Sequence, residues 1–475
     1  MASILLGNKN TRENTMSTNT SYLNSESLPE SALSAIPAAA REIMARLESC
    51  GYEAWLVGGC VRDLLLGREP GDYDITTSAL PDETQAAFPD CGTLEIGKAH
   101  GTIGVIWDHQ IYEVTTYRVD GEYTDCRHPN QVRFTRSLEE DLRRRDFTIN
   151  AIAVNLRGEM VGVAGFREDL QQQRLRAVGD PSQRFREDAL RIMRGIRFAS
   201  QLGFAIEERT AAAIHKDREL LRAIAAERIQ TELNKLLLGP AAEPVLREYR
   251  DVLAVFMPEL VATFDFDQQN PYHCYDVYEH CIHAVSNAPK TVVLRLAALL
   301  HDIGKPSCFL LKANWGHFYG HEQASAEMAH QILRRLKYDR KTISQVTELI
   351  DCHGYVFNRT EKYVRRRLNQ LGEEQLLNLI ALERADVLSQ AEHVREERAE
   401  NLDAFRDLVE EVIAKRSVLT RKDLALNGRD LLQMGIPEGP EVGRVVQIIF
   451  DRVIDGELPN ERDVLLNAAS EIITG

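Results

Sequence analysis

Two aspartates separated by a single residue, Asp72 and Asp74, follow an apolar segment and a pair of glycines early in the chain. The spacing predicts that both carboxylates project from one face of a strand, because side chains two residues apart on a strand share a face. Neighbouring carboxylates repel each other, and Mg²⁺ prefers one or two carboxylates together with substrate phosphates. The glycines, Gly58 and Gly59, let backbone N–H groups approach a triphosphate closely. The pattern predicts a metal-dependent site for nucleotidyl transfer.

A third acidic side chain, Glu113, lies in the strand-like segment IYEVTTYR. If it sits beside the aspartates, it can complete the metal shell or lower the pKa of an attacking hydroxyl. The alternative is an exposed glutamate on an edge strand. The sequence leaves both interpretations open.

The segment from the glycine pair to the second aspartate reads GGCVRDLLLGREPGDYD. It resembles the signature of the polymerase-β-like nucleotidyltransferases of the class II CCA-adding and bacterial poly(A) polymerase family, and the resemblance extends over residues 36–390. It implies that the two aspartates hold Mg²⁺ and that Arg62 and Asp63, beside the glycines, help to seat the triphosphate. An RNA 3′-OH would then attack the α-phosphate and release pyrophosphate.

Further along, DLRRRDFTINAIA matches the RRD motif of the same family at Arg144, Arg145 and Asp146. Guanidinium groups bind phosphate in a bidentate manner, and a carboxylate accepts hydrogen bonds from ribose hydroxyls. Asn150 is a further candidate for contact with the nucleotide. The alternative is a surface cluster of compensating charges.

The segment RFREDALRIMR matches the EDxxR motif of the class II branch at Glu187, Asp188 and Arg191. A continuous helix over 184–202 would place Asp188 and Arg191 on one face. The resemblance implies that this pair reads the base: the carboxylate accepts from an exocyclic amine, and the guanidinium donates to the adjacent ring nitrogen. Cytosine and adenine satisfy both contacts, whereas uracil and guanine do not. Glu187 would orient the arginine, and Arg194 continues the basic face.

Two other segments gain a meaning from the resemblance. The polar stretch 118–135 corresponds to a flexible loop that CCA-adding enzymes need for the final adenosine, and its presence argues against an enzyme that adds only CC. The segment 227–237 corresponds to a helix that steadies the base-reading helix.

A second set of candidate ligands lies in the helical part of the chain, where histidines and aspartates recur in the order His, His-Asp, Asp. This order, with LLHDIGK intact, resembles the HD-domain metal phosphohydrolases. Imidazole and carboxylate ligands suit Mn, Fe, Ni or Zn ions. His321 and His353 are candidates for a second ion or a phosphate. The primary candidate ligands are His280, His301, Asp302 and Asp386.

The composition limits the class of protein. The formal net charge of −15 over 475 residues argues against binding to nucleic acid through a broad basic surface. The 8 cysteines are scattered without a CxxC pair, which is typical of a reduced, cytoplasmic protein. Residues 1–33 are rich in Asn, Ser and Thr and lack the apolar core of a signal peptide, and no run is long enough to span a membrane.

The predicted fold is α+β, with a polymerase-β-like head that carries a mixed sheet, followed by an all-helical neck, body and tail. Short strand-like segments stop before residue 181, and helix-period segments follow to the end. The expected parts are a disordered extension (1–33), a nucleotidyltransferase head (34–175), a neck and start of the body with the base-reading helices (176–263), an HD domain (264–390) and a helical tail (391–475).

Taken together, the motifs predict an enzyme that adds CCA to tRNA from CTP and ATP and contacts the acceptor end and the elbow of the tRNA. Partial enzymes that add only A or only CC remain alternatives. A bacterial poly(A) polymerase is disfavoured because those enzymes tend to be basic. Two further alternatives are an HD phosphohydrolase acting on RNA end phosphates and a non-catalytic RNA-binding module. The sequence leaves the oligomeric state open.

Overall fold

The computed structural model describes residues 27–120, 132–415 and 420–474. Two compact units can be distinguished from the contacts between residues. One consists of Met1–Arg191 with Phe204–Asp217, and the other of Ile192–Gly203 with Arg218–Gly475. We describe each unit by itself; the five-part division expected from the sequence stays a prediction.

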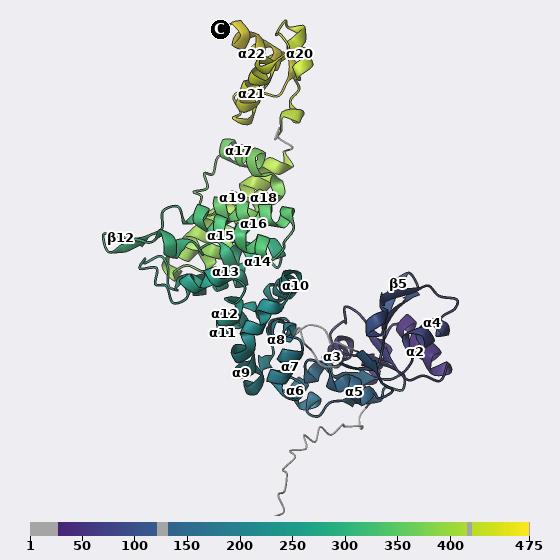
Figure 1. The fold of residues 1–475 in the computed structure, drawn as a ribbon. Coiled ribbons are helices and arrows are strands. Elements are labelled where there is room, and N and C mark those ends of the chain that lie inside the picture. The colour runs from purple at the N-terminus through teal and green to yellow at the C-terminus, as the bar shows by residue number, and fades with distance from the viewer. Residues whose placement is uncertain (1–26, 121–131, 416–419, 475) are drawn as a thin grey trace, which may run out of the picture. The chain divides into compact units, whose positions relative to one another are not determined.

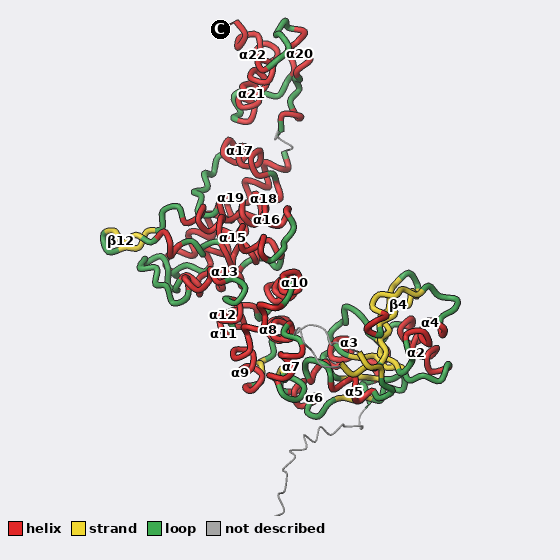
Figure 2. The backbone as a smooth tube through the Cα atoms, viewed as in Figure 1, coloured by secondary structure: helices red, strands yellow, loops and turns green. Residues whose placement is uncertain are grey.

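The first unit is built on a seven-stranded mixed sheet with the order β3-β4-β5-β2-β1-β8-β9 (Figures 1 and 2). β1 pairs antiparallel with both β2 and β8, whereas β2 pairs parallel with β5. Its strands are β1 (Ala54–Val57), β2 (Ile75–Thr77), β3 (Thr93–Gly97), β4 (Thr102–Trp107), β5 (Gln110–Thr116), β8 (Ile152–Val154) and β9 (Met160–Gly162), with the small pairs β6 (Arg118–Asp120) with β7 (Val132–Phe134) and β10 (Arg174–Leu175) with β11 (Ala205–Ile206). The mixed sheet confirms the predicted α+β class.

Helices cover the sheet through an apolar stripe. In α2, Ile43, Met44 and Leu47 recur at helical spacing and pack with Leu56 of β1 and Ile75 of β2 in one core. The helices of this unit are α1 (Glu30–Ser34), α2 (Ala38–Ser49), α3 (Gly59–Leu65), α4 (Pro81–Ala87), η1 (Lys98–His100), α5 (Leu138–Arg143), η2 (Thr148–Asn150), α6 (Phe166–Gln171), α7 (Pro181–Glu187) and α9 (Glu208–Asp217).

The ordered chain begins earlier than the expected boundary at residue 34. Leu28 is buried in the same core, its N–H donates to the Gly158 carbonyl at 2.8 Å, and α1 follows directly. The prediction that the whole of 1–33 is a disordered extension is therefore wrong for its last residues, which burial of an apolar side chain ties to the head. Residues 1–26 lie outside the described part.

Over its described residues, the second unit is helical apart from one hairpin, β12 (Leu310–Lys312) with β13 (Trp315–His317). Its helices are η3 (Arg218–Ala223), α10 (Ala226–Leu237), α11 (Ala242–Glu248), α12 (Arg250–Leu253), η4 (Pro258–Thr263), α13 (Val277–Asn287), α14 (Val292–Leu300), η5 (Lys305–Cys308), α15 (His321–Arg335), α16 (Arg340–Cys352), α17 (Glu361–Leu371), α18 (Glu373–Leu388), α19 (Glu392–Ala414), η6 (Arg421–Asp423), α20 (Gly428–Gln433), α21 (Pro440–Ile454) and α22 (Arg462–Thr474). One further helix, α8 (Leu190–Leu202), begins in the first unit and ends in the second.

The sequence of α14, VVLRLAALL, explains why it lies at the centre of this unit. Every residue from Leu294 to Leu300 is buried, since the helix is apolar on nearly all sides. Its N-terminus is capped by Thr291, whose hydroxyl accepts from the Leu294 N–H. The helix ends at Leu300, so that the His301-Asp302 pair follows it within the core.

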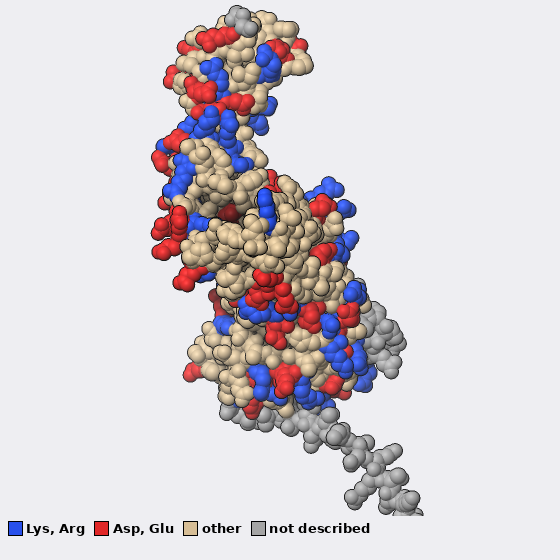
Figure 3. Space-filling view, turned by 90° about the vertical axis from the view of Figure 1, so that its left-hand side faces the viewer, with Lys and Arg blue, Asp and Glu red and all other residues tan. Residues whose placement is uncertain are grey.

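On the face of the molecule drawn in Figure 3, the described acidic and basic side chains are interspersed. Among the described residues, the helices are either too short or too polar to cross a membrane.

Candidate active site

The first part of the candidate site is a group of three carboxylates at the start of β2. The parallel register pairs Ile75 with Val114, so the preceding residues, Asp74 and Glu113, lie next to each other across the two strands. Both Asp74 and its neighbour Asp72 precede β2, which corrects the prediction that a strand carries them. The pairing with β1 reaches Asp74, since the Val57 N–H donates to the Asp74 carbonyl at 3.0 Å.

The electrostatics confirm that these carboxylates share one neighbourhood. Burial and the charge of Asp72 raise the pKa of Asp74 to about 6; Glu113 adds to the rise and Arg145 opposes it. Asp72 and Glu113 are exposed, and Asp74 is half-buried. A set of carboxylate oxygens that disfavour one another's charge fits a hard divalent cation such as Mg²⁺, which would remove the repulsion.

The glycine turn lies against the RRD motif. Gly58 has φ +83°, a conformation that favours glycine, and a Cβ atom there would lie 3.2 Å from Nη1 of Arg145. Its N–H donates to the Ile152 carbonyl at 3.0 Å, and α3 begins at the next residue, Gly59. The structure thus brings Gly58, Arg145 and Asp74 together from three separate motifs.

A hydrogen-bond network joins four of the residues predicted to seat the nucleotide. Arg62 donates to both carboxylate oxygens of Asp63 at 2.9 Å and to Oδ1 of Asn150 at 2.7 Å. The Asn150 amide donates to Asp146 at 3.4 Å. Arg62 is only 7% exposed, and its buried guanidinium links α3 to the segment after the RRD motif.

The sequence analysis missed a residue that holds the two arginines of the RRD motif. Asp141 is fully buried and accepts from Arg144 at 2.7 and 2.9 Å and from Arg145 at 3.3 Å. Burial opposes ionisation of Asp141, but the two guanidinium groups outweigh it and lower its pKa. The signal was available, since Asp141 precedes the arginines by three and four residues, which places them on one helical face.

The predicted continuous helix over 184–202 is wrong. Helix α7 ends at Glu187 and α8 begins at Leu190, and Asp188 between them has φ −138° and ψ 104°, which is extended. The Asp188 carboxylate accepts from the Leu190 N–H at 3.1 Å and so helps to start the second helix. The two base-reading candidates, Asp188 and Arg191, are therefore not neighbours on one helix face.

Arg191 is nevertheless held as the motif predicts. Its Nη1 donates to Glu187 at 2.8 Å, and its Nη2 donates to the main-chain carbonyl of Arg144 at 2.8 Å. The first contact is the one expected if Glu187 orients the arginine, a role that stays a prediction. The second joins the segment predicted to read the base to the RRD motif within the first unit.

The later part of α8 belongs to the second unit and is steadied by α10. Arg197 donates to the buried Glu232 at 2.8 Å, and the Ser200 hydroxyl donates to the Leu236 carbonyl at 2.6 Å. These contacts agree with the supporting role expected of segment 227–237. The guanidinium carbon of Arg194 lies 5.4 Å from the ring centre of Phe198, and its contact with a nucleotide stays a prediction.

The second unit contains the predicted cluster of histidines and aspartates. His280, His301 and Asp386 form one group of converging ligand atoms, and Asp302, His321 and His353 form another. Nε2 of His280 lies 2.7 Å from Asp386 and 3.3 Å from Nε2 of His301.

Asp302 links the two groups. Its Oδ2 lies 3.4 Å from His280 and 3.3 Å from His301, whereas its Oδ1 lies 3.3 Å from His321 and 3.5 Å from His353. The arrangement therefore presents one carboxylate to two sets of imidazoles.

All four histidines present the same nitrogen to the cluster. Their Nδ1 atoms lie beside main-chain carbonyls, and because a carbonyl only accepts, each Nδ1 carries the hydrogen. The carbonyls belong to Ser389, Ala298, Phe318 and Ile350, which face His280, His301, His321 and His353 in that order. The Nε2 atoms that remain are suitable metal ligands, oriented by the backbone as is usual in metal sites.

Close packing after the His-Asp pair assembles the second group. A Cβ atom at Gly304 would lie 2.7 Å from the Ser325 nitrogen and 2.9 Å from the His321 carbonyl, so only glycine allows α15 to approach this closely. The Gly304 N–H also donates to the Ser325 hydroxyl at 2.9 Å.

The charge balance of the cluster favours a cation. Burial opposes protonation of His301, but the Asp302 carboxylate outweighs it and raises the pKa of His301 well above its usual range. In the second group, Nε2 of His353 is buried and makes no hydrogen bond to any described residue. The cluster thus favours positive charge at His301, and it leaves Nε2 of His353 without a hydrogen bond. Both features fit a metal centre with nitrogen and oxygen ligands.

Comparison with known proteins places this architecture. A CCA-adding enzyme of Levilactobacillus brevis is 38% identical over 436 residues, which cover 91% of this chain and 97% of the relative. This chain belongs to the CCA-adding enzyme family. A CCA-adding enzyme of Geobacillus kaustophilus is 35% identical over 89% of this chain and 93% of the relative.

Solved structures of CCA-adding enzymes agree. The Bacillus stearothermophilus enzyme in complex with CTP superposes with a TM-score of 0.69 at 31% identity, covering 92% of this chain and 97% of that one. The Thermotoga maritima enzyme complexed with tRNA shares the fold at 18% identity, with a TM-score of 0.58 over 94% of this chain and 99% of that one.

Three family descriptions match separate parts of this CCA-adding family member. They are the Poly A polymerase head domain at 54–176, the probable RNA and SrmB-binding site of polymerase A at 203–263, and the putative tRNA nucleotidyltransferase domain 2 at 312–469. The predicted family, its head and its helical continuation are thus confirmed.

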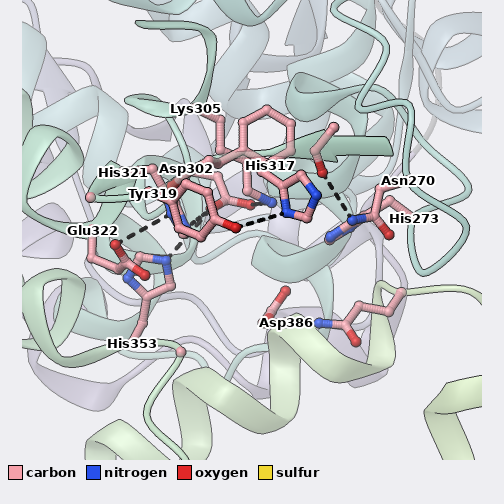
Figure 4. A pocket seen from close by; sticks show the side chains of 15 residues that line it. Asn270, His273, Asp302, Lys305, His317, Tyr319, His321, Glu322, His353 and Asp386 are labelled. Atoms are coloured by element: carbon pink, nitrogen blue, oxygen red, sulfur yellow. Dashed lines mark hydrogen bonds and ion pairs between the residues drawn. The ribbon is translucent and has the colours of Figure 1, made fainter. Parts of the chain in front are cut away.

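Four ligands of the His/Asp cluster line a pocket of about 370 Å³, namely Asp302, His321, His353 and Asp386 (Figure 4). Lys305 lines it and lies 2.6 Å from Asp302, a contact that the sequence analysis did not single out although HDIGK contains the lysine. Glu383, also not predicted, is buried nearby; burial and the charge of Asp386 raise its pKa to about 8. The predicted adenosine loop lies for the most part outside the described residues, which include only its base, β6 and β7.

Proposed function

We propose that this CCA-adding family member adds C, C and A to tRNA 3′ ends, using CTP and ATP. The observation that carries the proposal is that Asp74, Arg145 and Gly58 lie close together. A carboxylate, a guanidinium and a glycine turn are thus neighbours. The relatives support the same activity, since a CCA-adding enzyme at 31% identity was solved with CTP.

In this proposal Asp72 and Asp74 hold Mg²⁺, with Glu113 beside them. Mg²⁺, when bound, lowers the pKa of the attacking hydroxyl and neutralises charge on the triphosphate. Arg145 lies where it can bind a phosphate oxygen, and Asp141 holds it there. The contribution of the protein is then mainly positioning and electrostatic stabilisation, as expected for transfer of a phosphate-linked group.

Base selection rests on Asp188 and Arg191. A carboxylate that accepts an amine hydrogen and a guanidinium that donates to a ring nitrogen accept cytosine and adenine and reject uracil and guanine. Glu187 and the Arg144 carbonyl hold the guanidinium in place, so the orientation is set before the nucleotide arrives.

Full CCA addition is favoured over partial addition because the chain retains segment 118–135. A cytoplasmic location agrees with the unpaired cysteines among the described residues.

The decisive experiment offers tRNAs that lack CCA, CA or A, and tRNA with complete CCA, to the enzyme with each NTP separately. We expect CTP alone to extend the tRNAs that lack CCA or CA as far as CC, and ATP alone to complete the tRNA that lacks A. UTP and GTP should not be incorporated, and the tRNA with complete CCA should not be extended by any NTP. Asp74→Ala should abolish addition while tRNA binding persists, and the exposed control Glu95→Ala should leave both unchanged. Addition retained by Asp74→Ala would refute the carboxylate assignment.

We propose a second activity for the His/Asp cluster, namely metal-dependent hydrolysis of terminal or cyclic phosphates on RNA ends. Two groups of imidazole and carboxylate ligands share Asp302, and Lys305 adds a positive charge beside them. Mn, Fe, Ni or Zn, when bound, would polarise the phosphate. Water adds to phosphorus, the phosphorus–oxygen bond to the ribose breaks, and the ribose oxygen takes up the proton. Phosphate release from a 3′-phosphorylated oligonucleotide, lost in Asp302→Asn, is the test.

A further inference from the structure

An aromatic pair, the exposed Tyr319 and the half-buried His317, lines the metal pocket. Tyr319 is 68% exposed, although a side chain of this size usually packs against its neighbours. Its ring lies nearly parallel to that of His317, with an angle of 7° and 5.4 Å between the ring centres. The Tyr319 hydroxyl lies 3.4 Å from Nδ1 of His317. The two rings are stacked, so His317 lies against one face of the tyrosine ring.

This surface belongs to the pocket that contains the metal-ligand candidates. Tyr319 and His317 line the same cavity as Asp302, His321 and His353 (Figure 4). Its volume of about 370 Å³ lies at the lower end of the range for small-molecule sites. A ligand that fills it would meet the metal-binding groups, the Lys305 ammonium and the ring of Tyr319 within one cavity.

Trp315 of the β12–β13 hairpin provides a comparison for Tyr319. Trp315, two residues earlier than His317, is 44% exposed, but its ring packs edge-on against Tyr272 at 6.1 Å and does not line the pocket. Leu310 and Leu311 on the same hairpin are also exposed, at 52% and 53%, and do not line the pocket. Tyr319 differs from these exposed side chains because its ring lines the pocket.

We propose that Tyr319, backed by His317, stacks the nucleobase of a ligand whose phosphate reaches the metal-binding side of the pocket. The ligand class is a nucleoside with a 3′ or cyclic phosphate, either free or at the end of an RNA. Stacking suits this task because every base offers a flat face, so the platform accepts different bases. The proposal rests on the phosphohydrolase activity proposed above and assigns the specificity of that site for nucleotides over other phosphates.

The test uses the full chain loaded with Mn²⁺ and compares two phosphates, adenosine 3′-monophosphate and glycerol 3-phosphate, which lacks a base. Dissociation constants and phosphate release are measured for the wild type, Tyr319→Ala, Tyr319→Phe and the control Trp315→Ala. We expect Tyr319→Ala to weaken binding of the adenosine nucleotide about 10- to 100-fold, the range expected for loss of one base stack. Binding of glycerol 3-phosphate, and metal content, should stay unchanged, and Tyr319→Phe and Trp315→Ala should resemble the wild type.

The outcomes separate the two proposals. If the wild type releases phosphate from neither compound, the phosphohydrolase proposal fails, and the dissociation constants alone decide the stacking role. If Tyr319→Ala weakens both phosphates equally, or neither, the stacking role is overturned. A short RNA with a 3′-phosphate distinguishes the sources: tighter binding than the mononucleotide identifies an RNA end, and equal binding identifies a free nucleotide.

Discussion

The guanidinium of Arg191 donates to the main-chain carbonyl of Arg144 at 2.8 Å, although 47 positions separate them in sequence. The contact joins the segment predicted to read the base to the segment predicted to bind phosphate. Because a main-chain acceptor cannot be exchanged by mutation, this contact is tested by substitution of the arginine.

Substitution of that arginine tests the link. Lysine keeps the charge of Arg191 but lacks the fork that reaches Glu187 and the Arg144 carbonyl together. We expect Arg191→Lys to lower kcat/KM for CTP and ATP by about tenfold or more and to increase incorporation of UTP, because loss of one charged hydrogen bond costs about 1.5–3 kcal/mol. The exposed Arg186→Lys is the control; an unchanged CTP-to-UTP ratio in Arg191→Lys would contradict a role in base selection.

Metal binding at the head should depend on pH. The pKa of Asp74 is raised to about 6, so protons compete with Mg²⁺ below this pH, and the apparent affinity for Mg²⁺ should fall about tenfold per pH unit there. Above about pH 7 the affinity should be constant. Calorimetric titration from pH 5 to 8 measures this.

A matched variant checks the origin of that pH dependence. Arg145 opposes the rise of the Asp74 pKa, so Arg145→Gln should move the break to higher pH. A break that stays in place would show that Asp74 does not control the affinity.

Removal of a ligand from the His/Asp cluster should reduce the metal content by an amount that depends on whether the ligand faces one group or both. Asp302 faces both groups, whereas Asp386 belongs to only one. We expect Asp302→Asn to lose nearly all bound transition metal and Asp386→Asn about half, as measured by elemental analysis. CCA addition should be unaffected in both. Equal losses in the two variants would argue against a shared carboxylate.

Glu383 should make the stability of the metal-free protein depend on pH. Its pKa is raised to about 8 in the folded state, above the usual value near 4.3 in the unfolded chain, so the folded state binds the extra proton between these values. The free energy of unfolding should then fall by up to about 1.4 kcal/mol per pH unit as the pH rises through this window. Glu383→Gln keeps the acceptor for the Gly354 N–H and should remove this slope. Urea unfolding of both proteins in EDTA at pH 6 and pH 8 gives the comparison.

The buried Asp141 should be essential for the order of the RRD motif. Asp141→Ala leaves the guanidinium groups of Arg144 and Arg145 without their buried partner, and breaking such a pair costs about 3–5 kcal/mol. Urea unfolding should detect this loss, and the exposed Glu139→Gln should change stability by less than about 0.5 kcal/mol. A small effect of Asp141→Ala would show that other groups hold the arginines.

The sequence by itself determined the features that depend on neighbours in the chain. The strand-like pattern of IYEVTTYR predicted β5, and the positive φ of Gly58 shows that the chain turns at the glycine pair of the motif. The ion pair between Glu187 and Arg191, expected from their spacing, is present although the helix is broken between them. The family followed from the same local motifs.

Only the tertiary structure decided what brings distant segments together. The helix break at Asp188, the Arg144 carbonyl that receives Arg191, and the carboxylate of Asp302 shared by two groups of histidines follow from packing between elements. Helical period carries no information about which face meets which partner, and a close approach such as that at Gly304 depends on the volume of side chains many residues away. The side chains for the chemistry could therefore be named from the sequence, whereas their distances and charges required the fold.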